Sequence, residues 1–445
     1  MSDHRDQTRA DLLIGDLHPA LTDPTLEAMN FLNEVAGRFP DAVSFAAGRP
    51  CEEFFELDAL PRYLLTFQEY LESEKGADAD QVRRMFFQYG RTKGIIHELV
   101  AEHLAVDEGI AVDPESIVVT VGCQEAMFLT LRALCADAHD VVLAVSPSYI
   151  GLTGAARLLD REVWPVRETT RGVDLAHLVE QIEAARAVGK RPRAFYLVPD
   201  FANPSGLSMD LDSRKALLSL AAEYDLLLLE DNPYGLFQAE DGTRLPTLKA
   251  LDTDRRVVYL GSLAKTCFPG ARIGFVVADQ RVDVHGTAPV LLADQMSKIK
   301  SMLTVNTPSV AQAMAGGKLL EHGCSLVKAN SGEMEVYRRN LRLLLHGLEQ
   351  RFPAKGPLQV TWNRPTGGFF VVVTVPFAAD EEALEYSAQY HGVLWTPMRH
   401  FYDGSGGDNQ LRLSLSAVSP QQIDIGLDRL LSLVADLDTK ENETR

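Results

Sequence analysis

The chain is poor in cysteine, and its cysteines form no recognisable pair. There are five in 445 residues, an odd number, scattered over the sequence without a C-x-x-C motif: Cys51, Cys123, Cys135, Cys267 and Cys324. This pattern argues against a disulfide framework and against a zinc site, and it favours a reducing compartment such as the cytoplasm. We therefore expect no metal site.

Basic side chains are also scarce relative to acidic ones. The chain has 43 lysines and arginines against 62 aspartates and glutamates, which gives a formal net charge of -19 at pH 7. A surface that binds nucleic acid or anionic membranes needs the opposite balance. We therefore expect neither nucleic acid nor a membrane as a partner.

Long apolar runs are missing as well. The longest, at residues 369–375, is too short to span a bilayer, and the start, Met1-Ser2-Asp3-His4, lacks the apolar stretch of a signal peptide. Apolar residues nevertheless make up 46% of the chain, enough for a large core. We expect a soluble cytoplasmic protein of two domains, or of one large domain with an appendage.

Strand-like and helix-like segments alternate through the middle of the chain. Strands are expected at 117–121, 140–145, 162–166, 194–198, 226–230, 257–260 and 273–277, with helices between most of them. Such alternation predicts an α/β fold with a mostly parallel sheet covered on both faces. The stretch 52–80 reads as helix.

Beyond residue 308 the pattern changes to long helices, at 310–320 and 334–352, then strands at 369–375 and 410–416 and a closing helix from Gln421. This is typical of a smaller α+β domain. We expect a large domain at 66–308, a small domain at 309–445, and an N-terminal arm, residues 1–65, that partly belongs to the small domain.

One lysine, Lys265, lies just after the apolar segment 256–260 and is flanked by Ser262 and Arg272. An amine in a desolvated, cation-rich pocket has a lowered pKa and can attack a carbonyl. The hydroxyl and the guanidinium are suited to a phosphate. An amine beside a phosphate site suggests pyridoxal phosphate, although a surface lysine in a Gly/Pro loop is the common alternative.

Other polar residues follow the remaining predicted strands, and strand ends are where sheets of this kind bind ligands. Asp231 could hold a protonated pyridine nitrogen, and Tyr234 and Asn203 could hydrogen-bond a ring oxygen. The alternatives are turn residues and a core tyrosine.

Two further segments follow strands. Gly122-Cys123-Gln124 opens a helix after the strand 117–121, and a helix N-terminus suits a phosphate. Tyr149, after the next strand, could stack on a pyridine ring or be a core aromatic.

The order of these segments makes the chain resemble the fold-type I pyridoxal-phosphate-dependent aminotransferases of class I/II, the aspartate aminotransferase superfamily. The resemblance spans residues 40–434. It implies a large domain and a small domain, pyridoxal 5'-phosphate as cofactor, and an amino acid and a keto acid as substrates. It also implies a homodimer with shared active sites.

The resemblance implies a role for each residue. Lys265 matches the Schiff-base lysine that also moves the substrate α-proton, and Asp231 the partner of the pyridine nitrogen. Tyr89 resembles the tyrosine that reaches the neighbouring subunit's cofactor. Arg412 resembles the arginine that binds the substrate α-carboxylate, with a solvent-facing strand arginine as the alternative. The other matches are Tyr234 and Asn203 for the ring oxygen, Gly122, Cys123, Gln124, Ser262 and Arg272 for the phosphate, Tyr149 for stacking and Gly48 for closing over the substrate.

Residues 45–55 and 121–128 are similar to antibiotic-pathway enzymes of actinomycetes. That subgroup includes arylglycine aminotransferases and lincosamide-pathway enzymes that act on a cysteine-derived thioether. An aminotransferase with a specialised substrate is therefore the first hypothesis. A C–S lyase or decarboxylating deaminase is the second, and a non-catalytic regulatory protein on the same fold is the third. Met398 and Arg399 depart from the family's usual Pro-Gly turn and leave the substrate open. For His400 and Cys267 we expect structural roles.

Overall fold

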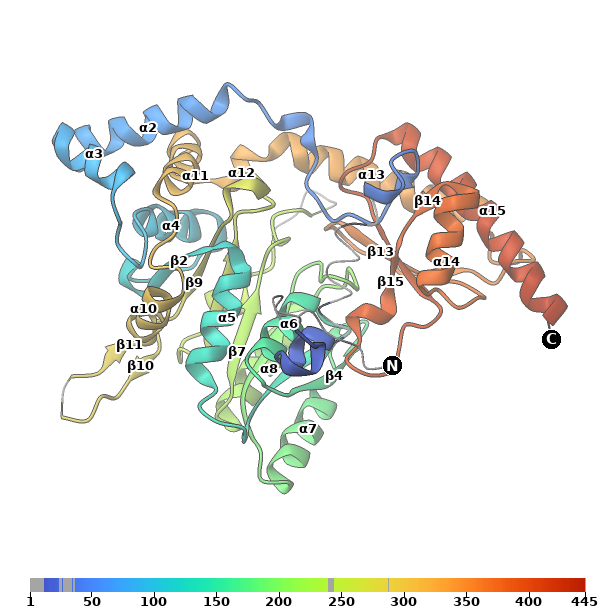
Figure 1. Ribbon diagram of the computed structural model, residues 1–445, viewed down its shortest axis with the longest axis horizontal. Coiled ribbons are helices and arrows are strands. Elements are labelled where there is room, and N and C mark those ends of the chain that lie inside the picture. Colours follow the sequence, from blue (N-terminus) through green and yellow to red (C-terminus); the bar gives the residue numbers. More distant parts are fainter. Residues whose placement is uncertain are drawn as a thin grey trace, which may run out of the picture.

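The computed structural model describes residues 12–23, 26, 34, 37–238, 244–286 and 288–444. Much of the N-terminal arm therefore lies outside the described residues. Figure 1 shows a large body that contains the central sheet and a smaller body, built from the C-terminal part of the chain, at its side.

The large sheet has eight strands in the order β2-β9-β8-β7-β6-β3-β4-β5. Neighbours from β8 to β4 run parallel, whereas β9 is antiparallel to both β2 and β8. The predicted mostly parallel α/β sheet is thus confirmed. The strands are β2 (Ile117–Val121), β3 (Asp140–Ser146), β4 (Val163–Thr169), β5 (Gly172–Val173), β6 (Arg191–Leu197), β7 (Leu227–Asp231), β8 (Val257–Ser262) and β9 (Ile273–Val277).

The reversed direction of β9 matters for the site. Its first residues lie at the same sheet edge as the last residues of β2 and β8, since Val121 pairs with Ile273 and Ser262 with Gly274. The loop that joins β8 to β9 is too short for a parallel crossover, which needs a dozen or more residues. Arg272 is therefore brought to the carboxyl ends of its neighbours.

Alternate side chains of the strands enter different cores, as expected for a sheet buried on both faces. Val142 and Ala144 belong to one apolar cluster, and Leu143 and Val145 to another. The covering helices include α4 (His97–His103), α5 (Gly122–Leu134), α6 (Ile150–Leu158), α7 (Leu175–Ala187), α8 (Leu211–Glu223), α9 (Leu248–Leu251) and α10 (Leu292–Leu303). A short hairpin, β10 (Arg281–Val282) with β11 (Val290–Leu291), precedes α10.

The stretch read as one helix at 52–80 is divided. A 3-10 turn at Glu52–Phe54 precedes α2 (Ala59–Ser73), and α3 (Ala79–Phe87) follows separately. Gly76 takes a positive φ of 65°, which ends the helical path, and Asp78 begins the next helix with a capping box to Gln81. The helix α11 (Ser309–Glu321) packs on α2.

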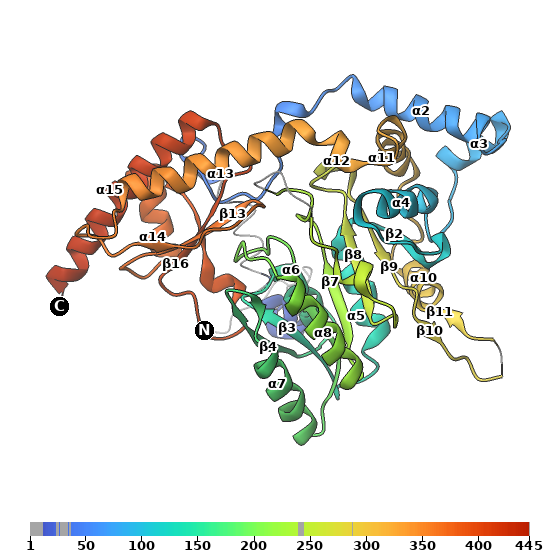
Figure 2. The same cartoon turned by 180° about the vertical axis from the view of Figure 1, so that it is seen from behind.

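The small body contains a four-stranded sheet in the order β12-β13-β16-β15. Its strands are β12 (Thr361–Trp362), β13 (Phe370–Thr374), β15 (Thr396–Pro397) and β16 (Gln410–Ser414). Its helices are α14 (Glu381–Tyr386) and α15 (Pro420–Thr444), while α13 (Ser331–Arg351), which follows α12 (Leu326–Ala329), runs from the large body to the small one (Figure 2).

The N-terminal segment joins the small body through β1 (Val43–Ser44), which pairs in parallel with β14 (Val393–Leu394). The predicted domain limits at 65/66 and 308/309 stay a prediction. The helix α2 spans the first limit and packs on α11. The helix α11 lies beyond the second limit and also packs against β9 of the large sheet.

Candidate active site

A cavity of about 890 Å³ lies at the carboxyl edge of the large sheet, closed on one side by the small body. It brings together eleven of the residues singled out in the sequence: Gly48, Cys123, Gln124, Tyr149, Asn203, Asp231, Tyr234, Ser262, Lys265, Arg272 and Arg412. Apolar side chains, among them Met127, Ile150, Phe370 and Phe401, complete the lining.

Lys265 is the amine of this cavity. Its Nζ donates a hydrogen bond to the carbonyl oxygen of Gly48 at 2.7 Å. Burial, then the positive charges of Arg412 and Arg272, lowers the pKa of Lys265 to about 8. A substantial fraction of the amine is therefore neutral near pH 8, the form that attacks a carbonyl.

Asp231 is the only acidic side chain in the described lining, and it is 3% exposed. The hydroxyl of Tyr196 donates to its Oδ2 at 2.7 Å, and the thiol of Cys123 donates to its Oδ1 at 3.6 Å. Burial raises the pKa of Asp231 to about 6, and these two donors oppose the rise. Tyr196 was not among the predicted site residues because it lies inside the apolar run 194–198. Tyr196 is the penultimate residue of β6, beside β7, and the register of these two strands is the signal that could have identified it.

The turn after β2 is formed by close backbone approach. Gly122 has a φ of +72°, and a Cβ built on it would lie 2.5 Å from Nη2 of Arg272. A Cβ on Gly274 would lie 2.5 Å from the carbonyl carbon of Gly122. The N-terminus of α5 and the Arg272 guanidinium thus face one small region, where free N–H groups and a cation favour an anion. Ser262 lines the cavity beside them.

Arg412 enters the cavity from β16 and is 6% exposed. Its Nη2 donates to the Ala46 carbonyl oxygen at 3.0 Å and to Oγ1 of Thr396 at 3.3 Å, while Nη1 donates to Oδ1 of Asn203. The guanidinium carbon lies 4.2 Å from the ring centre of Phe370. Buried Nε has no partner among the described residues, so an unpaired donor remains.

The arginine is therefore not a solvent-facing strand residue. Burial lowers the pKa of Arg412 to about 10, which leaves it charged at neutral pH. Thr396 was missed in the sequence because its role depends on cross-strand pairing with Arg412, about sixteen residues away.

Tyr149 and Tyr234 are both buried aromatic residues of the cavity. Burial, then nearby Asp231, raises the pKa of Tyr149 to about 12, and burial raises that of Tyr234 as well. Tyr234 packs edge-on against Phe369 and Phe370, with ring centres 5.2 and 5.5 Å apart. Both hydroxyls thus stay protonated and can donate at neutral pH.

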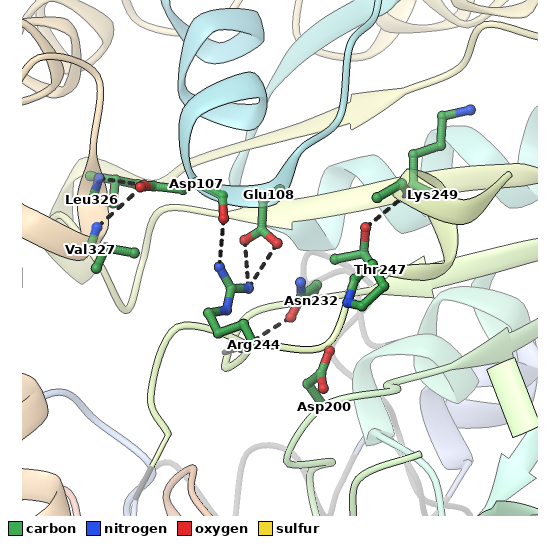
Figure 3. A network of polar contacts seen from close by, with 12 residues as sticks. Asp107, Glu108, Asp200, Asn232, Arg244, Thr247, Lys249, Leu326 and Val327 are labelled. Carbon is green, nitrogen blue, oxygen red and sulfur yellow. Dashed lines mark hydrogen bonds and ion pairs between the residues drawn. The ribbon is translucent and has the colours of Figure 1, made fainter. Parts of the chain in front are cut away.

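A polar network links Arg244 to Asp107 and Glu108 (Figure 3). Arg244 donates to both carboxylate oxygens of Glu108, at 3.0 and 2.8 Å, and to the carbonyl oxygen of Asp107. The Asp107 carboxylate in turn accepts from the backbone N–H groups of Leu326 and Val327. Asp107 thus connects Arg244 to the first residues of α12.

The remaining predicted residues lie elsewhere. Tyr89 is 85% exposed and does not line the cavity of its own chain. Cys267 is buried, and His400 lies within 2.9 Å of the Glu381 carboxylate; neither lines the cavity. Within the part of the chain that the structure describes, no cluster of His, Cys, Asp and Glu could hold a metal, and no helix is long and apolar enough to cross a membrane.

A doubly covered sheet whose edge brings together a lysine, a buried aspartate, an anion-binding turn and a buried arginine defines the class of vitamin B6-dependent enzymes of this fold. The model of the family "Aminotransferase class I and II" matches residues 62–430. The chain belongs to this family, and it is an aminotransferase that uses pyridoxal 5'-phosphate.

Individual relatives agree with this assignment. The (S)-3,5-dihydroxyphenylglycine transaminase of the actinomycete Amycolatopsis orientalis is 54% identical over 94% of this chain and 93% of its own length. The kynurenine aminotransferase of Pyrococcus horikoshii has a similar structure, with a TM-score of 0.78, 27% identity and coverage of 97% and 98% of the two chains.

The α-aminoadipate aminotransferase LysN of Thermus thermophilus, solved with N-(5'-phosphopyridoxyl)-L-leucine, has a TM-score of 0.75 at 27% identity, covering 96% and 98%. The predicted resemblance to the arylglycine subgroup, the enzyme class and the cofactor are thus confirmed. None of these three relatives supports the lyase hypothesis.

Proposed function

We propose that the enzyme moves the amino group between an arylglycine with a hydroxylated ring and a keto acid, in the cytoplasm, as a step of antibiotic biosynthesis. The relative from Amycolatopsis supports this substrate class through its printed name and its 54% identity. The cavity supports it through the aromatic side chains Phe370 and Phe401, which offer an apolar surface to a planar ring.

The residues of the cavity fit the cofactor on two observations. Asp231 is a buried carboxylate with no cation among its hydrogen-bond partners in the described part of the chain, so a protonated ring nitrogen would supply the missing positive charge. Gly122 and Gly274 lack the Cβ atoms that would push Arg272 and β9 away from the α5 N-terminus, so the guanidinium and the free N–H groups of the helix face one region that suits a phosphate. These two features, in one cavity with Lys265, are the observation that carries the proposal.

The bound cofactor supplies an electron-withdrawing ring that weakens the bonds at the substrate α-carbon. Lys265 is proposed to attach the cofactor and then to take and return the α-proton at its Nζ. Its lowered pKa suits both tasks, because the neutral amine is the base and the ammonium is the acid. Ser262 and Gln124 are proposed to bind the phosphate with the backbone of the turn, and Tyr149 to stack on the ring.

Arg412 is proposed to bind the α-carboxylate of the substrate. Its guanidinium is held by Ala46, Thr396 and Asn203 and retains an unpaired Nε donor, so little side-chain freedom is lost on binding. When an arginine fixes the carboxylate, the bond from the α-carbon to the carboxylate stays intact, and the Cα–H bond is the one that is positioned to break. This favours transamination over decarboxylation. Gly48, whose carbonyl oxygen accepts from Lys265, is proposed to close over the substrate, and Asn203 and Tyr234 to hydrogen-bond the ring oxygen.

We also propose a homodimer with shared active sites. Large apolar side chains are exposed on two neighbouring segments, 87–90 and 302–309; Phe87 is 83%, Tyr89 85% and Met302 86% exposed. The segments are close, since a Cβ on Gly90 would lie 3.6 Å from Asn306. Thr307 hydrogen-bonds the carbonyl oxygen of Val119 on β2, the strand that leads to the phosphate turn. A second copy seated on this surface would bring its own Tyr89 toward that turn.

The chemistry is tested by mixing the purified enzyme with single amino acids and following cofactor absorbance without any keto acid. 3,5-Dihydroxyphenylglycine should convert the cofactor to its amine form once and stop, and 2-oxoglutarate or another keto acid should restore it. Continuous turnover without a keto acid, or release of carbon dioxide, would contradict the proposal.

Shared sites are tested by mixing two inactive variants, Lys265→Ala and Tyr89→Ala. If Tyr89 acts in the partner's site, each hybrid dimer contains one site with an intact lysine and an intact tyrosine, and activity should return to about a quarter of the wild-type level in a one-to-one mixture. No gain of activity on mixing, with dimers seen by light scattering, would contradict it.

A further inference from the structure

The Asp231 carboxylate has one neutral donor on each oxygen. The Tyr196 hydroxyl contacts Oδ2 at 2.7 Å and the Cys123 thiol contacts Oδ1 at 3.6 Å. Tyr196 has no exposed surface, and its neighbours Phe195 and Leu197 point into the cluster on the opposite face of the sheet. The pair of contacts fixes both the position and the rotation of the carboxylate.

Both donors remain protonated at neutral pH. Burial, then the negative charge of Asp231, raises the pKa of Tyr196 and of Cys123. A group that always donates to a carboxylate favours its ionised form. Among the described residues, Asp231 makes no ion pair, so these two contacts are what opposes the effect of burial.

We propose that Tyr196 and Cys123 are positioning residues that keep the Asp231 carboxylate ionised and correctly oriented for the cofactor's ring nitrogen. This inference rests on the proposed role of Asp231. Neither residue touches the substrate in this scheme. Cys123 is also predicted to belong to the phosphate turn, where its backbone N–H can serve while its thiol donates to the aspartate.

The competing explanation is that Tyr196 merely fills the core. The two explanations differ in pH dependence. Removing a donor raises the pKa of Asp231. In the cofactor-free variant, Asp231 is therefore protonated in a larger share of the molecules, and it must lose this proton before the cofactor binds. The loss of cofactor affinity should therefore grow as the pH falls from 8 to 6, around the wild-type value of the Asp231 pKa, about 6. A packing defect alone would weaken binding equally at both pH values.

The experiment compares Tyr196→Phe with wild type after the cofactor has been removed and titrated back, with binding followed by absorbance. We expect the dissociation constant to rise about tenfold to a hundredfold at pH 6, the range for one hydrogen bond to a charged group, and less at pH 8. Tyr259→Phe is the matched control. Tyr259 is a buried tyrosine of β8, and in the strand register it lies opposite Glu230 rather than Asp231. It should show no pH-dependent loss.

Cys123 provides a second, independent pair of variants that keep the side chain small. Cys123→Ala removes the donor and should weaken binding severalfold at pH 6, whereas Cys123→Ser restores a donor and should recover affinity. Equal affinity of the two variants, together with a pH-independent effect of Tyr196→Phe, would overturn the inference. Failure of wild type to bind pyridoxal 5'-phosphate at all would instead overturn the proposed role of Asp231.

Discussion

Replacing Arg412 tests whether the oriented guanidinium of the cavity binds the substrate carboxylate. The guanidinium is already oriented by Ala46, Thr396 and Asn203 and lies over Phe370, so its donors need no rearrangement to bind a carboxylate. Two hydrogen bonds between charged groups are worth about 1.5 to 3 kcal/mol each. We expect Arg412→Leu to lose about 3 to 5 kcal/mol of transition-state binding, which at 1.4 kcal/mol per factor of ten lowers kcat/KM for an amino acid by roughly a hundredfold to several thousandfold.

A lysine at this position separates charge from geometry. Arg412→Lys keeps the positive charge but cannot contact Ala46, Thr396 and the substrate at once, so its loss should be smaller, about tenfold. Thr396→Val removes only the 3.3 Å contact to Nη2 and should have a milder effect still.

The assay is the half-reaction followed by cofactor absorbance, with an amino acid and with the amine that lacks its carboxylate. Wild type and Arg412→Leu should react with the amine at similar rates, because the amine has no carboxylate that Arg412 could bind in either protein. An equal loss for both compounds would show that Arg412 stabilises the site rather than binding the carboxylate. A loss smaller than threefold for the amino acid would refute the reasoning.

Three further outcomes are expected. In the cofactor-free protein, the free energy of unfolding should rise between pH 8 and 10.5 relative to that of Lys265→Met. The reason is that the pKa of Lys265 is lowered in the folded state, so the unfolded chain binds more protons in this pH range. Parallel pH profiles of the two proteins in denaturant unfolding would contradict this. Gly274→Ala should weaken cofactor binding by moving the turn after β2, whereas Gly270→Ala, with open space around it, should not, as equilibrium titration can show. Lys300→Met should lower unfolding free energy by about 3 to 5 kcal/mol, since it leaves buried Glu125 without its partner at 2.7 Å, and the double variant with Glu125→Gln should recover much of the loss.

Most of the cavity could be predicted from the sequence because its polar residues lie at or just after the ends of strands. Lys265, Asp231 and Asn203 each come shortly after an apolar run, and the carboxyl ends of parallel strands meet at one edge. The strand β9 was predicted, but its antiparallel direction was not. This direction explains why Arg272, which precedes the strand, reaches the turn at Gly122.

What the sequence could not provide depends on register and on contacts between distant segments. Tyr196 looks like any core residue until β6 is placed beside β7, and Thr396 becomes relevant only when β15 pairs with β16. The Arg244–Glu108 pair joins residues 136 apart in sequence, and no local pattern marks it. Tyr89 stays a prediction, because its role requires a second copy of the chain.

The central claim is that Lys265 is the amine that holds the cofactor, and its most direct test is reductive labelling. Borohydride treatment of the purified enzyme followed by peptide mass spectrometry should place the phosphopyridoxyl group on the peptide that contains Lys265. In Lys265→Ala, both the label and turnover should be absent. A label on another lysine, or turnover by Lys265→Ala at the wild-type rate, would contradict the account.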